Sequence, residues 1–251
     1  MPIIQVKKLK KKYGEFEAVR GIDFEVDEGE VFGLLGPNGA GKTTTVEILE
    51  GLIKSTSGEA FINNLDVSKD TKSVKKIIGV QLQSVNFFEK LSLFEIVELF
   101  STLYSYSVDP GKILGRVGLS NKKDSYFKTL SGGQKQRLSI AVALVNNPKV
   151  LFFDEPTTGL DPQARRNLWE LIKSFQEEGK TVVLTTHYME EAEELCDRVA
   201  IIDEGKIIKI NSPSNLIDEL TKSGFKSSKK IREATLEDVF IDLTGKSLRE
   251  D

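Results

Sequence analysis

The chain has 251 residues, of which 39% are hydrophobic and 29% are charged, a composition typical of a globular protein with a substantial core. Its formal net charge of -3 excludes a general electrostatic attraction to nucleic acid. Its one cysteine excludes an intramolecular disulfide, and no hydrophobic run approaches the roughly 18 to 20 residues that span a bilayer.

The N-terminal segment, residues 3–26, mixes strand-type alternation with turn signals at Tyr13-Gly14 and Arg20-Gly21. This pattern predicts an antiparallel pair of strands. The lysines between Lys7 and Lys12 are interpreted as the solvated side of an edge strand, not as a site for a polyanion. Because the segment lacks the long hydrophobic stretch of a signal peptide, we expect a cytoplasmic protein.

The next segment carries a phosphate-binding pattern. A short hydrophobic strand runs into GPNGAGKT, which matches G-x-x-x-x-G-K-[ST], and a stretch of helical spacing follows it. The glycines allow successive backbone N–H groups to turn toward phosphate oxygens, and the N-terminus of the helix adds partial positive charge. The pattern predicts that Lys42 reaches the β and γ phosphates and that the Thr43 hydroxyl ligates Mg²⁺. The predicted nucleotide-binding residues of this cradle are Gly36, Pro37, Asn38, Gly39, Ala40, Gly41, Lys42, Thr43 and Thr44.

Further strand candidates lie at residues 58–63 and 77–83, and after them the sequence pattern changes from strand type to helix type. From Leu91 to about Val145 the pattern is helical: Ser92 and Glu95 form a capping box, and a second amphipathic stretch starts near Asp109. We interpret this region, about 88–146, as a helical insertion between strands of the core.

Hydrophobic strands return after the insertion, at residues 150–153, 181–185 and 199–202, and a helix capped by Asp161 separates the first two. Strands alternating with helices of this length predict a mainly parallel sheet covered on both faces. Cys196 is interpreted as a buried, small hydrophobic residue.

The strand at 150–153 ends on two acids, and in doubly wound sheets ligands bind at the C-terminal ends of the strands. Asp154 is therefore placed to hold Mg²⁺ opposite Thr43. Glu155, one residue further on, points elsewhere and is the candidate for polarising an attacking water.

With the cradle and the acid pair, the stretch LSGGQKQR at residues 130–137 makes the chain resemble the nucleotide-binding subunits of ABC transporters. LSGGQ is the signature of that family, and the match is complete. In the family it completes the cradle of a second subunit, although an SGG before a helix is by itself usually a plain N-cap. The resemblance thus implies that a head-to-tail dimer sandwiches ATP with the signature residues Ser131, Gly132, Gly133 and Gln134.

The resemblance also implies the fold class: an α/β protein with a P-loop NTPase, RecA-like core and a mainly parallel sheet, an N-terminal antiparallel β subdomain and an inserted helical subdomain. Residues 1–210 would form the cassette. Residues 211–251 would form a helical C-terminal extension, with helices starting at Ser212-Pro213 and near Thr235, and this tail resembles those of subunits serving exporters.

Two residues resemble family positions at the nucleotide. Tyr13 resembles the aromatic residue that stacks on adenine, with a core or edge-strand tyrosine as the alternative. Gln83 resembles the glutamine that senses Mg²⁺ and the γ-phosphate. Gln81 lies two residues before it on the same strand face, and Leu82 stands where the family often has proline.

Two more residues complete the family's set of motifs. Asp161 resembles the residue of the loop that crosses the dimer interface, although helix capping alone would also explain it. His187, the only histidine, follows a strand end where the family's switch histidine lies against the γ-phosphate.

The resemblance implies an ATPase that powers transport, on balance export, of an unidentified substrate through separate integral membrane subunits, from the inner face of the cell membrane. Two copies, or this chain and a second ATP-binding subunit, would close on two Mg-ATP and reopen after hydrolysis by water held by Glu155 and His187. The partner's cytoplasmic helix would dock between core and insertion, near Gln83 to Leu91.

Two other functions compete with this one. A soluble ABC-type ATPase acting on DNA or ribosomes would carry a coiled-coil insertion or two cassettes, and neither is present, so we expect no nucleic-acid partner. A nucleotide-binding structural protein without turnover is disfavoured by the intact Glu155 and His187.

Overall fold

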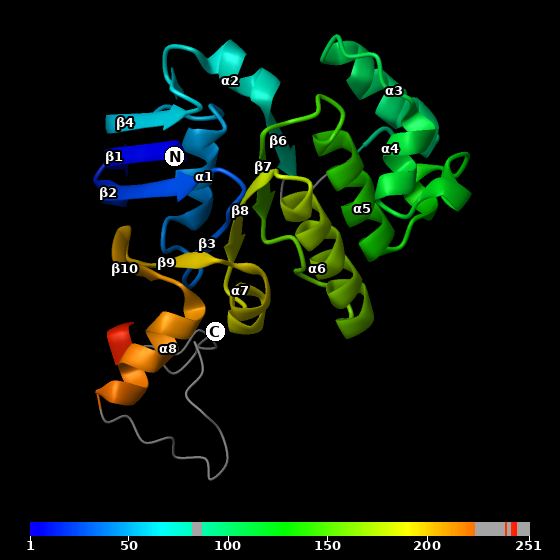
Figure 1. Cartoon of the computed structure of the whole chain (residues 1–251). Helices are drawn as coiled ribbons and strands as arrows, with labels where there is room; N and C mark the ends of the chain where they lie inside the picture. Colours follow the sequence, from blue (N-terminus) through cyan, green and yellow to red (C-terminus); the bar gives the residue numbers. More distant parts are fainter. Residues whose placement is uncertain (82–86, 224–238, 240–241, 245–251) are drawn as a thin grey trace.

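The structure is a computed structural model that describes residues 1–81, 87–223, 239 and 242–244. Its elements form an antiparallel sheet, a larger mainly parallel sheet, and helices around them (Figure 1).

The N-terminal sheet has the strand order β2-β1-β4-β5. Strands β1 (Pro2–Tyr13) and β2 (Phe16–Asp27) form the predicted antiparallel pair. On its other side β1 pairs with β4 (Ser57–Ile62), which in turn pairs with the short β5 (Leu65–Asp66).

The expectation of an edge strand for the lysine cluster is therefore wrong, because β1 lies between two strands. The lysines still face solvent for a local reason. The pairing with β2 shifts register between Val6 and Leu9, and this irregularity turns both Lys7 and Lys8 outward between two buried residues.

The larger sheet has the order β10-β9-β3-β8-β7-β6. All neighbours from β9 to β6 pair in parallel, which confirms the mainly parallel sheet, whereas the edge strand β10 is antiparallel and was not predicted. The strands are β3 (Val31–Leu35), β6 (Ile78–Gln81), β7 (Val150–Asp154), β8 (Thr181–Thr186), β9 (Arg198–Asp203) and β10 (Lys206–Asn211).

The side chains of β3 alternate between two hydrophobic clusters. Phe32 and Leu34 pack with the antiparallel sheet, where the Phe32 ring stacks on Phe24 with centroids 5.4 Å apart. Val31 and Leu35 face the helices of the other side. Burial on both faces explains why the parallel strands are continuous hydrophobic runs in the sequence.

The helices that accompany the sheets in the described part of the chain are α1 (Lys42–Leu49), α2 (Thr71–Ile77), α6 (Pro162–Glu177), α7 (Met189–Leu195) and α8 (Pro213–Lys222). The predicted caps are confirmed at Asp161, whose Oδ1 accepts from the amides of Gln163 and Ala164, and at Ser212. The start of the helix expected near Thr235 lies outside the described residues, and the described residues 239 and 242–244 are helical. Cys196 is buried as expected, against Gly33.

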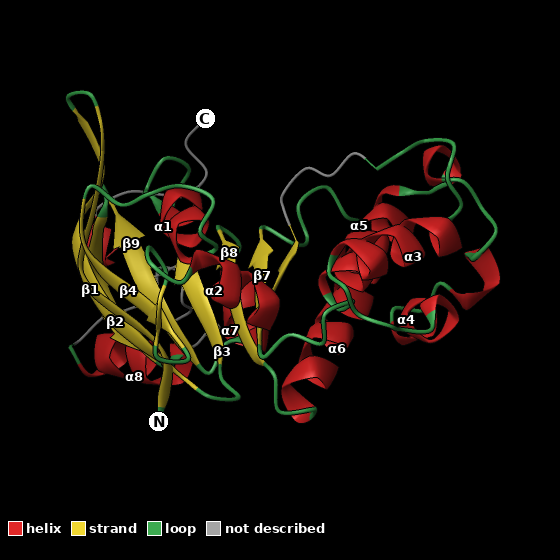
Figure 2. Ribbon diagram, turned by 90° about the horizontal axis from the view of Figure 1, so that it is seen from above, coloured by secondary structure: helices red, strands yellow, loops and turns green. Residues whose placement is uncertain are grey.

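The helices predicted between the strands now called β6 and β7 are present as α3 (Leu93–Leu103), α4 (Pro110–Arg116) and α5 (Gly132–Ala143), with short 3-10 turns at Ser120–Lys122 and Phe127–Thr129. The capping box of Ser92 and Glu95 is confirmed. In Figure 2, α3 and α4 lie on the side of the parallel sheet away from the antiparallel strands. The boundaries expected for the cassette (1–210), the helical insertion (about 88–146) and the C-terminal extension (211–251) stay predictions.

Candidate nucleotide site

The cradle loop joins β3 to α1 and is shaped by its glycines. Gly36 has no room for a side chain, because a Cβ there would lie 2.1 Å from the Ile202 carbonyl oxygen. Gly39 and Gly41 have φ angles of 79° and 98°, in the region that side chains disfavour. The first intrahelical bond runs from the Thr45 amide to the Gly41 carbonyl. The amides at the start of α1 therefore point out of the helix into the loop, where phosphate oxygens bind well.

Lys42 lies at the bottom of the cradle and is only 4% exposed. Its Nζ donates to the carbonyls of Gly36 at 2.8 Å and Pro37 at 3.0 Å, and lies 3.6 Å from Glu155 Oε1. Burial lowers the pKa of Lys42, while the charges of Glu155 and Asp154 oppose that shift. A polyphosphate would offer this ammonium stronger acceptors than two neutral carbonyls.

Asp154 and Thr43 face each other as predicted, with the Thr43 hydroxyl 3.2 Å and 3.3 Å from the two carboxylate oxygens. The carboxylate also accepts a hydrogen bond from the Thr185 hydroxyl of the neighbouring strand β8. Mg²⁺ is usually bound by one or two protein oxygens, waters and substrate phosphates, so one hydroxyl and one oriented carboxylate beside a phosphate cradle fit this ion. Among the described residues there is no cluster of three or more acidic, histidine or cysteine ligands.

Glu155 takes an unusual backbone conformation, with φ of 47° in the left-handed region. Its amide is held by the carbonyl and the hydroxyl of Thr185, at 3.2 Å and 3.0 Å, and the Thr158 hydroxyl donates to Oε2 at 3.3 Å. Backbone strain of this kind persists only where the surroundings enforce it, and it is concentrated at functional sites.

His187 follows β8 and is the last of the predicted catalytic residues, with its Nδ1 3.2 Å from Glu155 Oε1. The same carboxylate oxygen thus lies between the imidazole and the Lys42 ammonium. The structure therefore brings together the predicted lysine, both acids, the predicted metal-binding threonine and the histidine.

A cavity of about 620 Å³ opens above these residues. Tyr13, 48% exposed, lies in its wall, together with Phe16 from the next strand, which sequence reasoning missed. Tyr13 and Phe16 are paired across the β1–β2 turn, so the only signal for Phe16 was its place in that hairpin. The described residues that line the cavity are Tyr13, Phe16, Ala18, Asn38, Gly39, Gly41, Lys42, Thr43, Thr44, Glu155, Thr158 and His187.

The structure does not bring the signature residues or Asp161 to this cavity. Ser131 caps α5 in a capping box with Gln134, and Asp161 caps α6. An added Cβ at Gly133 would lie 3.5 Å from the Ala164 Cβ, so the start of α5 lies beside the start of α6. Gln83 lies outside the described residues.

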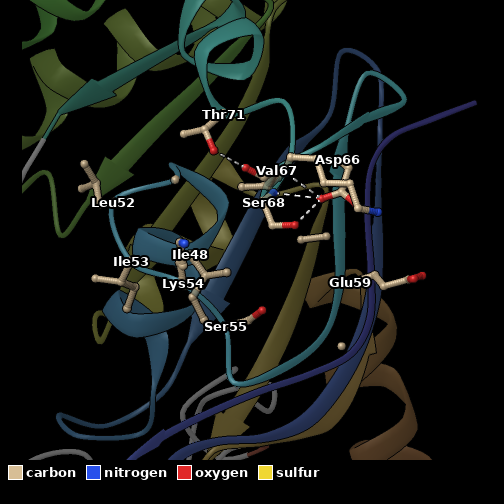
Figure 3. A pocket seen from close by; sticks show the side chains of 14 residues that line it. Ile48, Leu52, Ile53, Lys54, Ser55, Glu59, Asp66, Val67, Ser68 and Thr71 are labelled. Carbon is tan, nitrogen blue, oxygen red and sulfur yellow. Dashed lines mark hydrogen bonds and ion pairs between the residues drawn. The ribbon is translucent and has the colours of Figure 1, made fainter.

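A second cavity, of about 420 Å³, lies between the end of α1 and the antiparallel sheet (Figure 3). There the amide and hydroxyl of Ser68 donate to Asp66, and the Thr71 hydroxyl donates to the Val67 carbonyl. The hydrogen bonds of these polar groups hold the turn into α2. We therefore place the nucleotide in the first cavity, the one above the cradle.

Comparison with known proteins agrees with this geometry. The ABC transporter family matches residues 19–158. A linearmycin resistance ATP-binding protein of Bacillus subtilis is 39% identical over 223 residues, covering 87% of this chain and 72% of that protein. A Nod factor export ATP-binding protein of Paraburkholderia xenovorans is 43% identical over 219 residues, covering 85% and 72%.

Solved structures share the fold. The ATP-binding subunit of an ABC transporter superposes with a TM-score of 0.82 at 27% identity, covering 96% of this chain and 99% of that one. A dimeric ATP-binding cassette in a post-hydrolysis state with ADP and Pi has a TM-score of 0.75 at 30% identity, covering 83% and 98%. Across the residues that the structure describes, no helix is long and hydrophobic enough to span a membrane. By its cradle, its acid pair and these likenesses, the chain belongs to the ABC transporter family, as an ATP-binding and ATP-hydrolysing subunit.

Proposed function

We propose that this chain hydrolyses Mg-ATP at the cradle of β3 and α1 and uses the cycle to drive export through separate membrane subunits. The observation that carries the catalytic part is the convergence of Lys42 and His187 on one carboxylate oxygen of Glu155, next to the facing pair of Thr43 and Asp154.

In this proposal each residue has one task. Lys42 leaves the loop carbonyls for the β and γ phosphates, while Thr43 and Asp154 hold Mg²⁺, which neutralises charge on the phosphates. Glu155 accepts a hydrogen bond from the water that attacks the γ-phosphorus and takes up its proton as the bond to ADP breaks. His187 contacts the γ-phosphate. Tyr13 stacks on the adenine, and Phe16 extends the same wall.

The second half of the site comes from another subunit. Ser131, Gly132, Gly133 and Gln134 lie outside the cavity of their own chain, and the start of α5 offers amides and a partial positive charge suited to phosphate. We propose that they cover the cradle of a second cassette, with Asp161 at the interface. A dimeric relative of the same fold supports this arrangement.

The membrane partner is proposed to dock between the sheet and the helices α3 to α5. A groove of about 280 Å³ is present there, and Phe87 and Phe100 lie in its wall. Phe88, 64% exposed, follows directly. Two relatives of this chain are named for linearmycin resistance and for Nod factor export, which favours export as the direction of transport. We place the chain at the inner face of the cell membrane.

The Glu155→Gln variant tests the catalytic assignment. It keeps the shape of the side chain but removes the negative charge that accepts the proton of the water, so we expect ATP hydrolysis to fall by about 10²- to 10⁴-fold while ATP still binds. With ATP the variant should accumulate as a dimer in size-exclusion chromatography. The matched control is Glu170→Gln, the same change at an exposed position of α6, which should hydrolyse ATP like the wild type.

The docking assignment is tested by identifying the integral membrane protein that copurifies with the tagged chain. Recovery of DNA or ribosomes in place of a membrane protein would support the alternative of a soluble ABC-type ATPase. Turnover of ATP by Glu155→Gln at the wild-type rate would show that the assigned base is wrong.

A further inference from the structure

The groove between the sheet and α3 to α5 contains a buried acid that the catalytic site does not use. Hydrophobic and aromatic side chains from β6, α3, α5 and the segment before α3 form its walls, and Leu52, 51% exposed, stands at its edge. Glu50, at the C-terminal end of α1, lies in the same lining and is only 2% exposed.

Among the residues that the structure describes, Glu50 has no partner of opposite charge. Its Oε1 is buried, and across the described part of the chain it accepts no hydrogen bond and forms no ion pair with a basic group. Lys75 lines the groove as well but forms no such ion pair. Burying an ionised acid without a partner costs free energy. The position of Glu50 in the proposed docking groove therefore suggests that a group of the docked protein pairs with it.

The electrostatic surroundings favour a cation at this place. Glu50 ends α1, where the last carbonyls of the helix present partial negative charge. Burial raises the pKa of Glu50 to about 8, and the charges of Asp154 and Glu47 add to that shift. The helix end and the neighbouring acids attract positive charge and repel negative charge, and a cation placed beside Glu50 would favour its ionised form.

We propose that the segment of the membrane subunit that docks in this groove carries a lysine or arginine whose charge pairs with Glu50. The inference rests on the proposed docking of a membrane subunit and specifies its chemistry: a hydrophobic helix with one basic side chain directed at the end of α1. The ion pair would fix the register of that helix, because only one position along the groove brings the two charges together.

The pairing would also connect docking to the catalytic site. Glu50 ends the helix whose start forms the cradle, and the charge of Asp154, the proposed magnesium ligand, contributes to the raised pKa of Glu50. A cation placed against Glu50 stabilises its ionised form and so alters the field at the end of the sheet where nucleotide binds.

The experiment uses the full chain with an affinity tag in its own cells, and quantifies the integral membrane protein recovered with it. Glu50→Gln keeps the volume and removes the charge, and should lower recovery several-fold. Glu50→Lys places a cation against the incoming cation, and should lower it by about 10-fold or more. Glu170→Gln and Glu170→Lys make the same charge changes at an exposed position of α6 and should recover the partner like the wild type.

A photo-crosslinking amino acid in place of Leu52 identifies the docked segment by mass spectrometry. We expect a lysine or arginine in that segment, and its replacement by glutamate should restore the recovery lost in Glu50→Lys. ATP binding and thermal unfolding of each purified variant separate loss of docking from loss of folding, and Glu50→Gln should unfold no earlier than the wild type.

The outcomes distinguish the inference from the proposal beneath it. Recovery of the membrane protein by Glu50→Gln at the wild-type level, or a crosslinked segment without a basic residue, overturns the pairing but leaves docking intact. Failure of the wild-type chain to recover any integral membrane protein overturns the proposed function itself.

Discussion

At the scale of single residues, the two acids after β7 have different surroundings although they are adjacent in sequence. Asp154 ends the strand in register with Thr185 and faces Thr43. The left-handed backbone at Glu155 then turns its carboxylate toward Lys42 and His187. The strand end thereby separates the proposed roles of holding magnesium and of activating water.

Thr185 links the two acids, because its hydroxyl donates to Asp154 while its oxygen accepts from the Glu155 amide. Thr185→Val removes both bonds with little change of shape. We predict that ATP hydrolysis falls by about 10- to 100-fold and that more Mg²⁺ is needed for half-maximal activity, as for other groups that orient metal ligands. Steady-state assays over a range of Mg²⁺ concentrations measure both quantities.

Thr181→Val is the matched control for this prediction. It removes a buried hydroxyl from the opposite end of the same strand, where Thr181 accepts a hydrogen bond from the Gly29 amide. Its cost should appear in stability and not in the Mg²⁺ dependence. Equal effects of both variants on that dependence would contradict the role given to Thr185.

Glu50 makes the stability of the isolated chain depend on pH. Its pKa is raised from 4.5 to about 8 by burial, with Asp154 and Glu47 adding to the shift, so between these values the folded state binds a proton that the unfolded state has lost. The protonated Glu50 side chain therefore stabilises the folded state fully below pH 4.5. This stabilisation is lost as the pH rises through the pKa of about 8 in the folded state.

Glu50→Gln removes that dependence. We compare the free energy of unfolding of the variant with that of the wild type. We predict that the variant is about as stable near pH 4.5 and more stable by the order of a few kcal/mol above pH 8. Urea unfolding at several pH values in this interval measures the difference. An advantage that stays constant with pH would show that the carboxyl group titrates normally.

At the scale of elements, most of the fold could be predicted because local signals and burial agree. The strands of the parallel sheet are hydrophobic runs, and Ser92, Asp161 and Ser212 mark helix starts with side chains that do cap them. The internal place of β1 could not be predicted, because its pairing with β4, a strand distant in sequence, decides it. Strand β10 escaped prediction because its alternation is weak and its side chains are only partly buried.

The site was predictable to a similar extent. Patterns of residue types identified Lys42, Thr43, Asp154, Glu155 and His187 as a group, and the structure brings them together. No pattern could give the left-handed backbone at Glu155 or the bonds of Thr185, because both depend on how β7 and β8 end side by side.

The capping box of α3 offers a prediction at this scale. In Ser92→Ala the Glu95 amide loses its acceptor at 3.2 Å, and Glu95 Oε2 loses the hydroxyl that donates to it. A lost N-cap costs about 1 kcal/mol, which lowers the melting temperature of a chain of this size by roughly 2–4 °C. Differential scanning calorimetry measures the shift, and Ser92→Thr, which keeps the hydroxyl, should retain most of the stability.

At the scale of the whole molecule, the chain separates the two sets of groups that would enclose one nucleotide. The cradle opens into a cavity that the signature residues of the same chain do not line. The start of α5 is exposed, with open space around Gly132. A complete site then requires a second cassette, which makes hydrolysis depend on association.

Gly132→Asp tests this dependence without disturbing the single chain, because an added Cβ at Gly132 meets nothing within 4 Å. A carboxylate there would face the γ-phosphate across the proposed interface and repel it, so we predict at least roughly 10-fold slower hydrolysis and loss of the ATP-dependent dimer in the Glu155→Gln background. Melting temperature and ATP binding to the single chain should stay at wild-type values. Ser214→Asp, an acid added to the exposed first turn of α8, should leave dimer and hydrolysis unchanged. A stable ATP-bound dimer of the Gly132→Asp double variant, detected by light scattering, would place the second half of the site elsewhere.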